Sequence, residues 1–528
     1  MEDEEALWKF LFLGSLVGVY RPGYRQIEDS DADVIRRLIK NGRHNKVIEY
    51  ICRASRKCLK FYPIAYTLAL CARHDKKAVS KQAYAALPYV CRTPSHLFQF
   101  LSFCRTRFKC RGWPRSHRRA IAAWYTENEQ YRNDPKKLAI HVTKYKRRHM
   151  FSQKKVIKSC HPKPPNEAFQ YIFHYVTNGV KKANKGKANE KETQNVKGYI
   201  TAVEFIKNKH NSDQEEVIKE VIQKWGIPWE SIPTSHLQSP EIWRALLRHN
   251  MPMIAMIRNL GRMGRLGILK PKSEDERIIC ERLRSVDLVE SIHPIQLLAA
   301  FAAYRRGRGL RDSGHTWDVN KEIERALVAS YSLSAKNFEP TKSRVLIAID
   351  VNMNMDFHVL GIPSMSCKEA AVALSLLFHS SFEVQTITFF KSAQKTFLEN
   401  PSGDLFDIDF SEKHTESGEK ETNYNVPFHY AKENKFDIIL LLTDTLETKD
   451  IDKIRRSYQK SKQPNSKCVV VCFKTSRPAS VLGDSSMLDV VGVDEYAVEI
   501  IMDFIKDYKR EMIQITGGQG HEKMEVEN

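Results

Sequence analysis

A dense group of basic side chains between residues 135 and 150 has the clearest chemical potential in this sequence. Taken as one helix, the segment places four cationic or titratable side chains on a single face: Lys137, His141, Lys144 and Arg148. Like charges four residues apart destabilise an isolated helix by about 0.2–0.5 kcal/mol per pair, so such a face favours a bound polyanion. A solvated basic face is the alternative interpretation of this pattern.

The neighbouring sequence favours the polyanion. Residues 51–200 contain 33 Lys or Arg and only 7 Asp or Glu, a net charge of +26. The cations that flank the segment are Arg105, Arg107, Lys109, Arg111, Arg115, Arg118, Arg119, Lys154, Lys155, Lys158, His161 and Lys163. A cationic field of this size stores repulsion that nucleic acid would relieve. Because no zinc-finger spacing and no aromatic RNA-binding strand is present, single-stranded or irregular RNA on a helical array is the better hypothesis.

Aromatic side chains lie among these charges and have two interpretations. Trp113 and Tyr145 could stack on unpaired bases. Trp124 and Tyr125, in the apolar run AIAAWY, are predicted to be core residues instead.

Two carboxylates end apolar runs in the last third of the chain. Asp350 closes RVLIAID and Asp444 closes FDIILLLTD. In a parallel sheet, ligands bind at the carboxyl ends of strands, so these residues are candidates for a binding site. The alternative is that they accept hydrogen bonds from local amides. No paired catalytic carboxylates, P-loop or nucleophile elbow accompanies them, so we do not expect an enzyme.

Residues 1–335 read as a succession of helices. Thr93-Pro94 and Ser239-Pro240 each combine an N-cap residue with proline at the first helical position. Many helices of 10–20 residues with short loops indicate a helical solenoid. Residues 181–197 have no apolar periodicity and are expected to form a disordered loop or flexible insert.

After residue 340, short β-rich runs alternate with amphipathic helices, which is typical of a doubly wound, mostly parallel sheet. Ser366 and Glu369 form a capping-box pattern before the first of these helices. We therefore predict an α-helical domain at residues 1–340 and an α/β domain at 341–516, with an inserted loop near 411–423. A disordered tail is predicted at 517–528.

Overall composition limits the class of protein. The 528 residues carry a net charge of +21, and 42% are hydrophobic, which suits a globular chain. Eleven cysteines without a C-x-x-C motif suggest reduced thiols in the cytosol or nucleus. The longest apolar stretch, residues 10–20, is too short to span a bilayer, and the acidic N-terminus does not read as a secretory signal.

Several longer motifs resemble those of the TROVE module: SHLF (95–98), AIHVTKYKRR (139–148), SCHPKP (159–164), MIRNLGRM (256–263) and IHPIQLLAAFAAYRRGRGLR (292–311). Their order resembles the Ro 60-kDa ribonucleoprotein family, in which a TROVE module precedes a von Willebrand factor A-like domain. This resemblance implies a ring of HEAT-like helical repeats closed by the A-like domain. It also implies binding of Y RNA on a basic surface and of the 3′ ends of misfolded small RNAs, such as 5S rRNA precursors. Lys144, Arg148 and His161 match RNA-contacting positions of the family.

The resemblance also implies a divalent-metal site, for Mg²⁺ or a similar ion, in the A-like domain. The family motif D-x-S-x-S reads Asp350-Val351-Asn352-Met353-Asn354 here, and the later ligand positions fall on Thr422 and Asp444. Both serines are thus replaced by asparagine. The bulkier amides are expected to crowd the octahedral cage that Mg²⁺ requires, which makes weakened affinity the expected outcome.

These observations are compatible with three functions. The first is an RNA-binding ribonucleoprotein protein of small-RNA quality control, monomeric and cytoplasmic, with nuclear import left open. The second is a protein scaffold with partners on the A-like domain. The third and least favoured is a nuclease that uses His141 or His161 with a lysine.

Overall fold

The structure is a computed structural model, and it divides into two compact units. Unit 1 comprises residues 1–16, 24–279 and 316–320, and unit 2 comprises residues 17–23, 280–315 and 321–528. The residues that the structure describes are 3–14, 19–20, 27–28, 30–57, 60–110, 112–186, 189–208, 214–249, 251–289, 291–310, 314–335, 343–380, 382–390, 392–395, 422–464, 466–475 and 486–506. Closure of a ring by the two units, and a domain boundary at residue 340, stay predictions.

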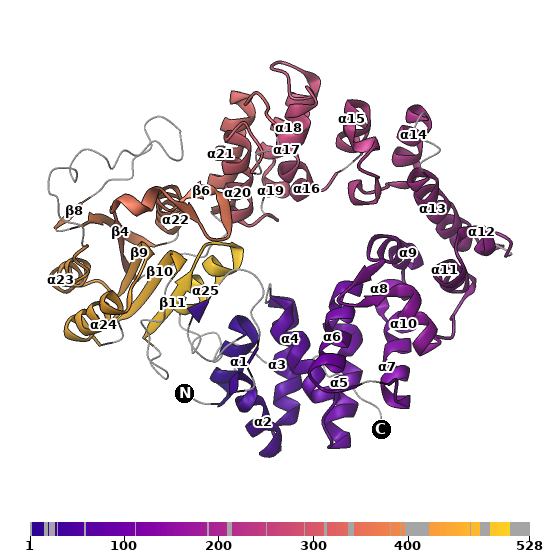
Figure 1. The fold of residues 1–528 in the computed structure, drawn as a ribbon, viewed down its shortest axis with the longest axis horizontal. Helices are drawn as coiled ribbons and strands as arrows, with labels where there is room; N and C mark the ends of the chain where they lie inside the picture. Colours follow the sequence, from indigo (N-terminus) through magenta and orange to yellow (C-terminus); the bar gives the residue numbers. More distant parts are fainter. Residues whose placement is uncertain are drawn as a thin grey trace. The chain divides into compact units, whose positions relative to one another are not determined.

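Unit 1 is built almost entirely from helices (Figure 1). They are α1 (Asp3–Leu13), α2 (Asp33–Lys40), α3 (His44–Lys57), α4 (Phe61–Ala72), α5 (Lys77–Val90), α6 (Pro94–Thr106), α7 (Arg115–Thr126), α8 (Glu129–Arg132), α9 (Pro135–Lys144), α10 (Gln153–Cys160), α11 (Glu167–Asn178), α12 (Val180–Ala183), α13 (Lys191–Lys207), α14 (Glu215–Trp225), α15 (Pro240–Arg248), α16 (Met253–Arg258), α17 (Leu260–Arg265) and α18 (Glu274–Arg284), which continues into unit 2. A two-stranded hairpin, β2 (Arg147–Arg148) and β3 (Phe151–Ser152), connects α9 to α10.

Successive helices of unit 1 pack on their neighbours and on the next helix but one, as in a helical solenoid. Helix α4 is buried along nearly its whole length, because α1, α3, α5 and α6 surround it. The capping predictions are confirmed: the hydroxyl of Thr93 accepts a hydrogen bond from the main-chain N–H of His96, and Ser239 caps α15. Trp124 and Tyr125 are fully buried, as predicted.

Unit 2 contains a seven-stranded sheet in the order β1-β11-β10-β9-β4-β7-β8, parallel except for the β7–β8 pair. Its elements are β1 (Val19–Tyr20), α19 (Val286–Val289), α20 (Pro294–Arg305), α21 (Lys321–Ala335), β4 (Arg344–Asp350), β5 (His358–Val359), β6 (Ile362–Ser366), α22 (Cys367–His379), β7 (Glu383–Phe389), β8 (Ala393–Lys395), α23 (Asn425–Asn434), β9 (Ile438–Thr445), α24 (Thr448–Ser461), β10 (Lys467–Thr475), β11 (Met487–Val491) and α25 (Glu495–Lys506). Helices α23 and α24 share one apolar core with the sheet.

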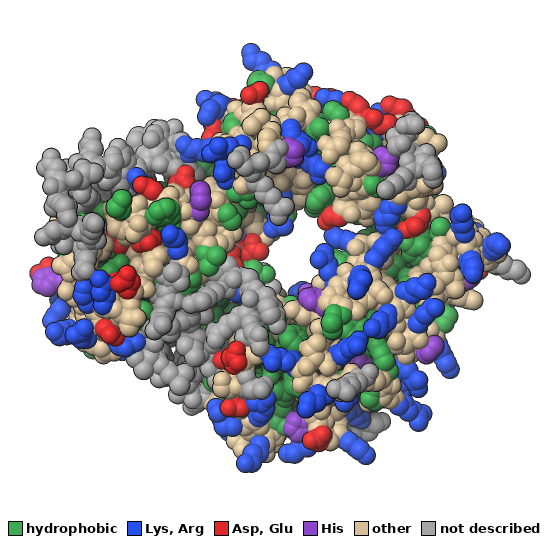
Figure 2. All heavy atoms as spheres, viewed as in Figure 1, with side chains coloured by type: hydrophobic (Ala, Val, Ile, Leu, Met, Phe, Trp, Pro, Cys, Tyr) green, Lys and Arg blue, Asp and Glu red, His purple; other side chains and the backbone are tan. Residues whose placement is uncertain are grey.

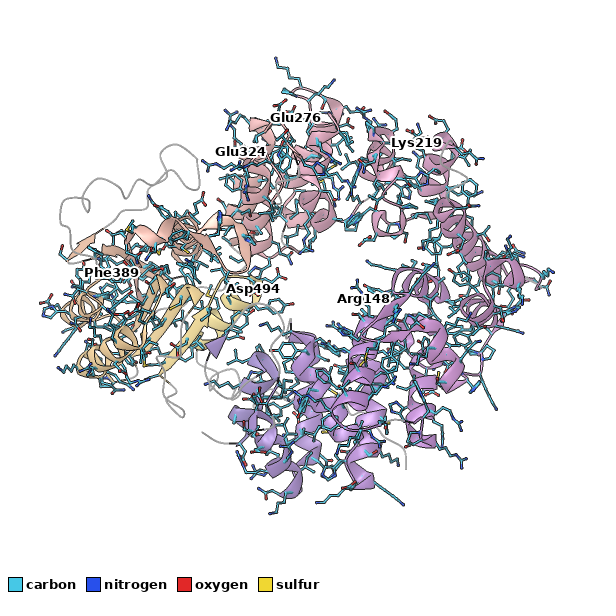
Figure 3. All side chains as sticks on the ribbon, in the orientation of Figure 1. Arg148, Lys219, Glu276, Glu324, Phe389 and Asp494 are labelled. Atoms are coloured by element: carbon cyan, nitrogen blue, oxygen red, sulfur yellow. The ribbon has the colours of Figure 1, made fainter. Side chains whose placement is uncertain are left out.

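The α/β interpretation of the last third is therefore confirmed, and the Ser366–Glu369 capping box is present at the start of α22. The first strand was not predicted. The two residues of β1 pair in parallel with β11, and the hydroxyl of buried Tyr20 lies 2.6 Å and 2.7 Å from the two carboxylate oxygens of Asp494. Figure 3 marks Asp494 beside this edge of the sheet.

The expectation of a disordered insert at 181–197 is wrong. Residues 180–183 form α12, and α13 already begins at Lys191. Lys, Glu and Gln have good helix propensity, and the buried side chains of Thr193 and Val196 anchor the first turns of α13. The insert expected at 411–423 falls mainly outside the described residues, as does the tail at 517–528.

The described residues also show the state of the cysteines and whether any helix could span a membrane. Among those residues, no helix is both long and apolar enough to cross a bilayer. The ten described cysteines are free thiols, and all except Cys52 are buried.

Candidate nucleic-acid interface

Three helices of unit 1 begin with basic residues where the helix dipole favours acids. Helices α7, α9 and α10 have no acidic residue in their first turns. The exposed basic side chains in those turns are Arg115, Arg118 and Arg119 of α7, Lys137 of α9, and Lys154 and Lys155 of α10. The positive end of a helix dipole repels such charges and attracts anions. Figure 2 shows Lys and Arg side chains crowding this part of the molecule, with few Asp and Glu.

The prediction of one helix from Pro135 to Met150 is wrong in its second half. Helix α9 ends at Lys144, and the chain turns into the β2–β3 hairpin, whose turn residues His149 and Met150 both have positive φ. A longer helix would carry four cations in five residues, whereas the hairpin buries Phe151 and lets Ser152 cap α10. Lys144 and Arg148 therefore do not share a helical face.

Both side chains nevertheless remain at the surface. Lys144 is exposed at the end of α9, and Arg148 is exposed on β2, where Figure 3 labels it. Arg147 and Lys146 are exposed beside them. The hairpin thus presents consecutive cations that need no helical periodicity to act together.

His141 is placed differently from its neighbours on α9. Its ring is half-buried, and its Nδ1 lies 2.9 Å from the hydroxyl of Tyr131. Burial, together with the charges of Lys137 and Lys144, lowers the pKa of His141 to about 4. The imidazole is therefore neutral at pH 7 and adds no charge to the basic surface.

Acidic side chains pair with two of the cations at the end of α9. The ammonium of Lys144 lies 3.0 Å from Oε1 of Glu230, and that of Lys146 lies 3.4 Å from Oε1 of Glu204. Glu204 also accepts a hydrogen bond of 2.8 Å from Tyr175. Half-buried Lys207 donates to the main-chain oxygen of Thr143, and burial lowers its pKa to about 8.

His161 lies at the other end of α10. It is exposed, and with a φ of +49° it ends the helix in the left-handed conformation. Lys158 and Lys163 are exposed on either side of it in sequence. The structure thus brings all the predicted RNA-contacting positions except His141 to the surface. Lys207 was missed, and so were Glu230 and Glu204, the acidic partners of Lys144 and Lys146.

The strand-end carboxylates of unit 2 form a separate polar cluster. Asp350 and Asp444 are only 1% and 4% exposed, and Asn352 lies between them. Burial raises the pKa of Asp350 to about 6; hydrogen bonds from Thr443 and Asn352 oppose that rise, and the charge of Asp444 adds to it.

The residues of this cluster do not fit a metal cage as they are arranged. The amide nitrogen of Asn352 donates 2.9 Å hydrogen bonds to both Asp350 and Asp444, so hydrogens point at the oxygens that would ligate an ion. Asn354 is exposed, and Thr422 donates to Asp350 over 3.3 Å. Among the described residues, no group of three or more His, Cys, Asp or Glu side chains could hold a metal ion.

Comparisons with known proteins identify two family domains along the chain. A TROVE domain model matches residues 2–310, and a Ro60 vWA domain model matches residues 344–505. RNA-binding protein RO60 of Caenorhabditis elegans is 29% identical, with 96% of this chain and 88% of that protein covered. RNA-binding protein RO60 of Deinococcus radiodurans is 30% identical, with 71% of this chain and 68% of that protein covered.

A solved structure extends the agreement to the fold. The crystal structure of the Deinococcus radiodurans RO (RSR) protein matches with a TM-score of 0.78 and 26% identity, covering 95% of this chain and 99% of that one. It confirms the expected class of helical repeats combined with a von Willebrand factor A-like domain. The resemblance inferred from the motifs is thereby confirmed, and the chain belongs to the Ro60 family of TROVE proteins.

Proposed function

We propose that this protein binds small noncoding RNA through the basic surface of α7, α9, α10 and the β2–β3 hairpin. The observation that carries the proposal is the concentration of exposed cations on these elements, which are Arg115, Arg118, Arg119, Lys137, Lys144, Lys146, Arg147, Arg148, Lys154 and Lys155. A dense group of positive charges with few acidic neighbours stores repulsion that a bound polyanion relieves. Two relatives carry the name RNA-binding protein RO60, which supports the same ligand.

The ligands we propose are Y RNA and the 3′ ends of misfolded small RNAs, including 5S rRNA precursors. The protein would stabilise the first and take part in quality control of the second, as a non-enzymatic component of cytoplasmic ribonucleoproteins.

The surface suits recognition of the sugar-phosphate backbone. Exposed Lys144, Arg147 and Arg148 can each neutralise a phosphate, and Arg can do so with two parallel hydrogen bonds. Such contacts release counterions, so a site that neutralises about six phosphates loses roughly a thousandfold in affinity between 50 and 200 mM salt. Tyr145 is partly exposed beside these cations, with the ammonium of Lys144 5.5 Å from its ring centroid, and its aromatic ring is of the kind on which unpaired bases stack.

The test is an electrophoretic shift with a structured small RNA at graded salt concentrations. The double variant Lys144→Ala/Arg148→Ala should bind more weakly, and its salt slope should fall by about 1.4 for single-stranded contacts. The matched control is Lys76→Ala/Lys77→Ala, which removes two exposed lysines at the start of α5. Equal losses in both variants would mean a diffuse basic coat rather than this surface.

The same preparation separates the competing functions. A protein that shifts no RNA at physiological salt would favour the protein scaffold, and cleavage of labelled RNA would favour a nuclease. Crosslinking in cells followed by sequencing of the attached RNA would identify the natural ligands.

A further inference from the structure

The polar cluster at the ends of β4 and β9 brings two like charges together inside the protein. Asp350 is the last residue of β4 and Asp444 lies near the end of β9, and both side chains are almost completely buried. Buried carboxylates are retained only when hydrogen bonds or a cation compensate for the lost hydration. In this chain, the lost hydration of Asp350 and Asp444 must therefore be compensated by groups within the cluster.

One amide supplies much of that compensation. The Nδ2 of Asn352 lies 2.9 Å from Oδ2 of Asp350 and 2.9 Å from Oδ1 of Asp444. An amide group has two N–H bonds, so it can donate one hydrogen to each carboxylate. Its Oδ1 accepts a 2.8 Å hydrogen bond from the main-chain N–H of Asn354, so both ends of the amide are engaged.

The acceptor capacity of Asp350 is also filled. Oδ1 accepts from the main-chain N–H of Asn352 at 3.1 Å and from Thr422 at 3.3 Å. Oδ2 accepts from Thr443 at 2.8 Å and from Tyr424 at 3.3 Å, in addition to the amide. A carboxylate offers about four lone-pair sites, and five donors converge on this one. A cation could bind only by displacing donors that are already in place.

The geometry also resists simple rearrangement of the amide. For Asn352 to ligate a cation through oxygen, the amide would have to turn over, which breaks its bond with the N–H of Asn354. The same turn removes both hydrogens from the carboxylates. We propose that Asn352 takes the place of a cation in this A-like domain. Its amide bridges Asp350 and Asp444, so the two buried carboxylates are held together without a metal ion.

This inference is independent of RNA binding, and the full-length protein tests it. Calorimetric titration of the native protein with Mg²⁺ and with Mn²⁺ should be flat up to about 1 mM, and its thermal midpoint should be the same in EDTA and in either metal. Binding of Mn²⁺ below 1 mM that Asp350→Ala abolishes would overturn the proposal. Because this arm uses the native chain, it decides the question even if a variant fails to fold.

The converse arm restores the serines. The variant Asn352→Ser/Asn354→Ser removes the bridging amide and leaves room for an ion and its waters. We expect it to melt earlier than the native protein in EDTA and to gain about 5 °C when Mn²⁺ is present at a hundred times its Kd. Adding Asp444→Asn should abolish that gain. A double-serine variant that keeps native stability in EDTA and binds no metal would show that the amide is not what replaces the ion.

Discussion

The acidic partners of Lys144 and Lys146 should limit the affinity of this protein for RNA. The pairs join Lys144 to Glu230 over 3.0 Å and Lys146 to Glu204 over 3.4 Å, and the four side chains are between 27% and 57% exposed. Phosphates that approach these lysines must break the pairs and then remain near the displaced carboxylates. Replacing either acid by glutamine keeps the side chain's size and removes its charge.

The magnitude follows from the exposure of the pairs. Exposed ion pairs contribute about 0.2–1 kcal/mol, and a carboxylate about 6 Å from a phosphate adds repulsion of roughly 0.7 kcal/mol in water. Salt screens part of each contribution, so each acid should weaken RNA binding by about 0.5–1 kcal/mol. We therefore expect Glu230→Gln and Glu204→Gln each to tighten RNA binding two- to fivefold. The salt slope should steepen by about 0.7 if one more phosphate contact forms.

Filter binding with one structured small RNA at 50, 100 and 200 mM salt measures both quantities. The matched control is Glu49→Gln on α3, because Glu49 is as exposed as Glu230 and pairs with Lys46 and Arg53 away from the basic surface. Unchanged affinity in Glu230→Gln, together with weaker binding in Lys144→Ala, would refute the idea that carboxylate and phosphate compete for the same lysine.

Two further predictions concern stability. Burial lowers the pKa of His117 to about 4, against an ordinary value near 6.5, so the unfolded state binds more protons as the pH falls from 7 towards 4. The native protein should lose on the order of 2 kcal/mol of its free energy of unfolding between pH 7 and pH 4.5 because of this group. The variant His117→Gln should lose less stability over the same range, which melting curves at several pH values measure. Identical pH profiles of the two proteins would contradict this. Gly261→Ala would place a Cβ 2.8 Å from the ring of Trp317, which should destabilise unit 1 by about 1–3 kcal/mol despite better helix propensity. Thermal melting and tryptophan fluorescence measure that effect, with Gly112→Ala as a control whose Cβ meets nothing within 4 Å; equal melting of both variants would count against it.

Much of the fold was predictable because it rests on local patterns. The strands that carry Asp350 and Asp444 are continuous apolar runs, and the capping box at Ser366 has a fixed spacing. The core position of Trp124 followed from its apolar neighbours. Such signals lie within a few residues of the element that they specify.

The missed features depend on partners that are distant in sequence. Glu230 is 86 residues from Lys144, and Glu204 is 58 residues from Lys146, so nothing near either lysine indicates its partner. The end of α9 was missed because basic residues continue the helical spacing into a segment where the backbone instead turns back. The bridging role of Asn352 requires knowledge of where Asp444 lies in space.

The edge strand β1 has a consequence for the synthesis of this protein. Tyr20 is synthesised well before its partner Asp494, which lies 474 residues further along the chain. At 5–20 residues per second, translation needs roughly 24–95 s to deliver that partner, so the edge of the sheet forms long after Tyr20 has been synthesised. A recombinant fragment limited to residues 344–505 lacks β1, so one edge of β11 has no strand paired to it. We expect the fragment to associate with other copies of itself through that edge.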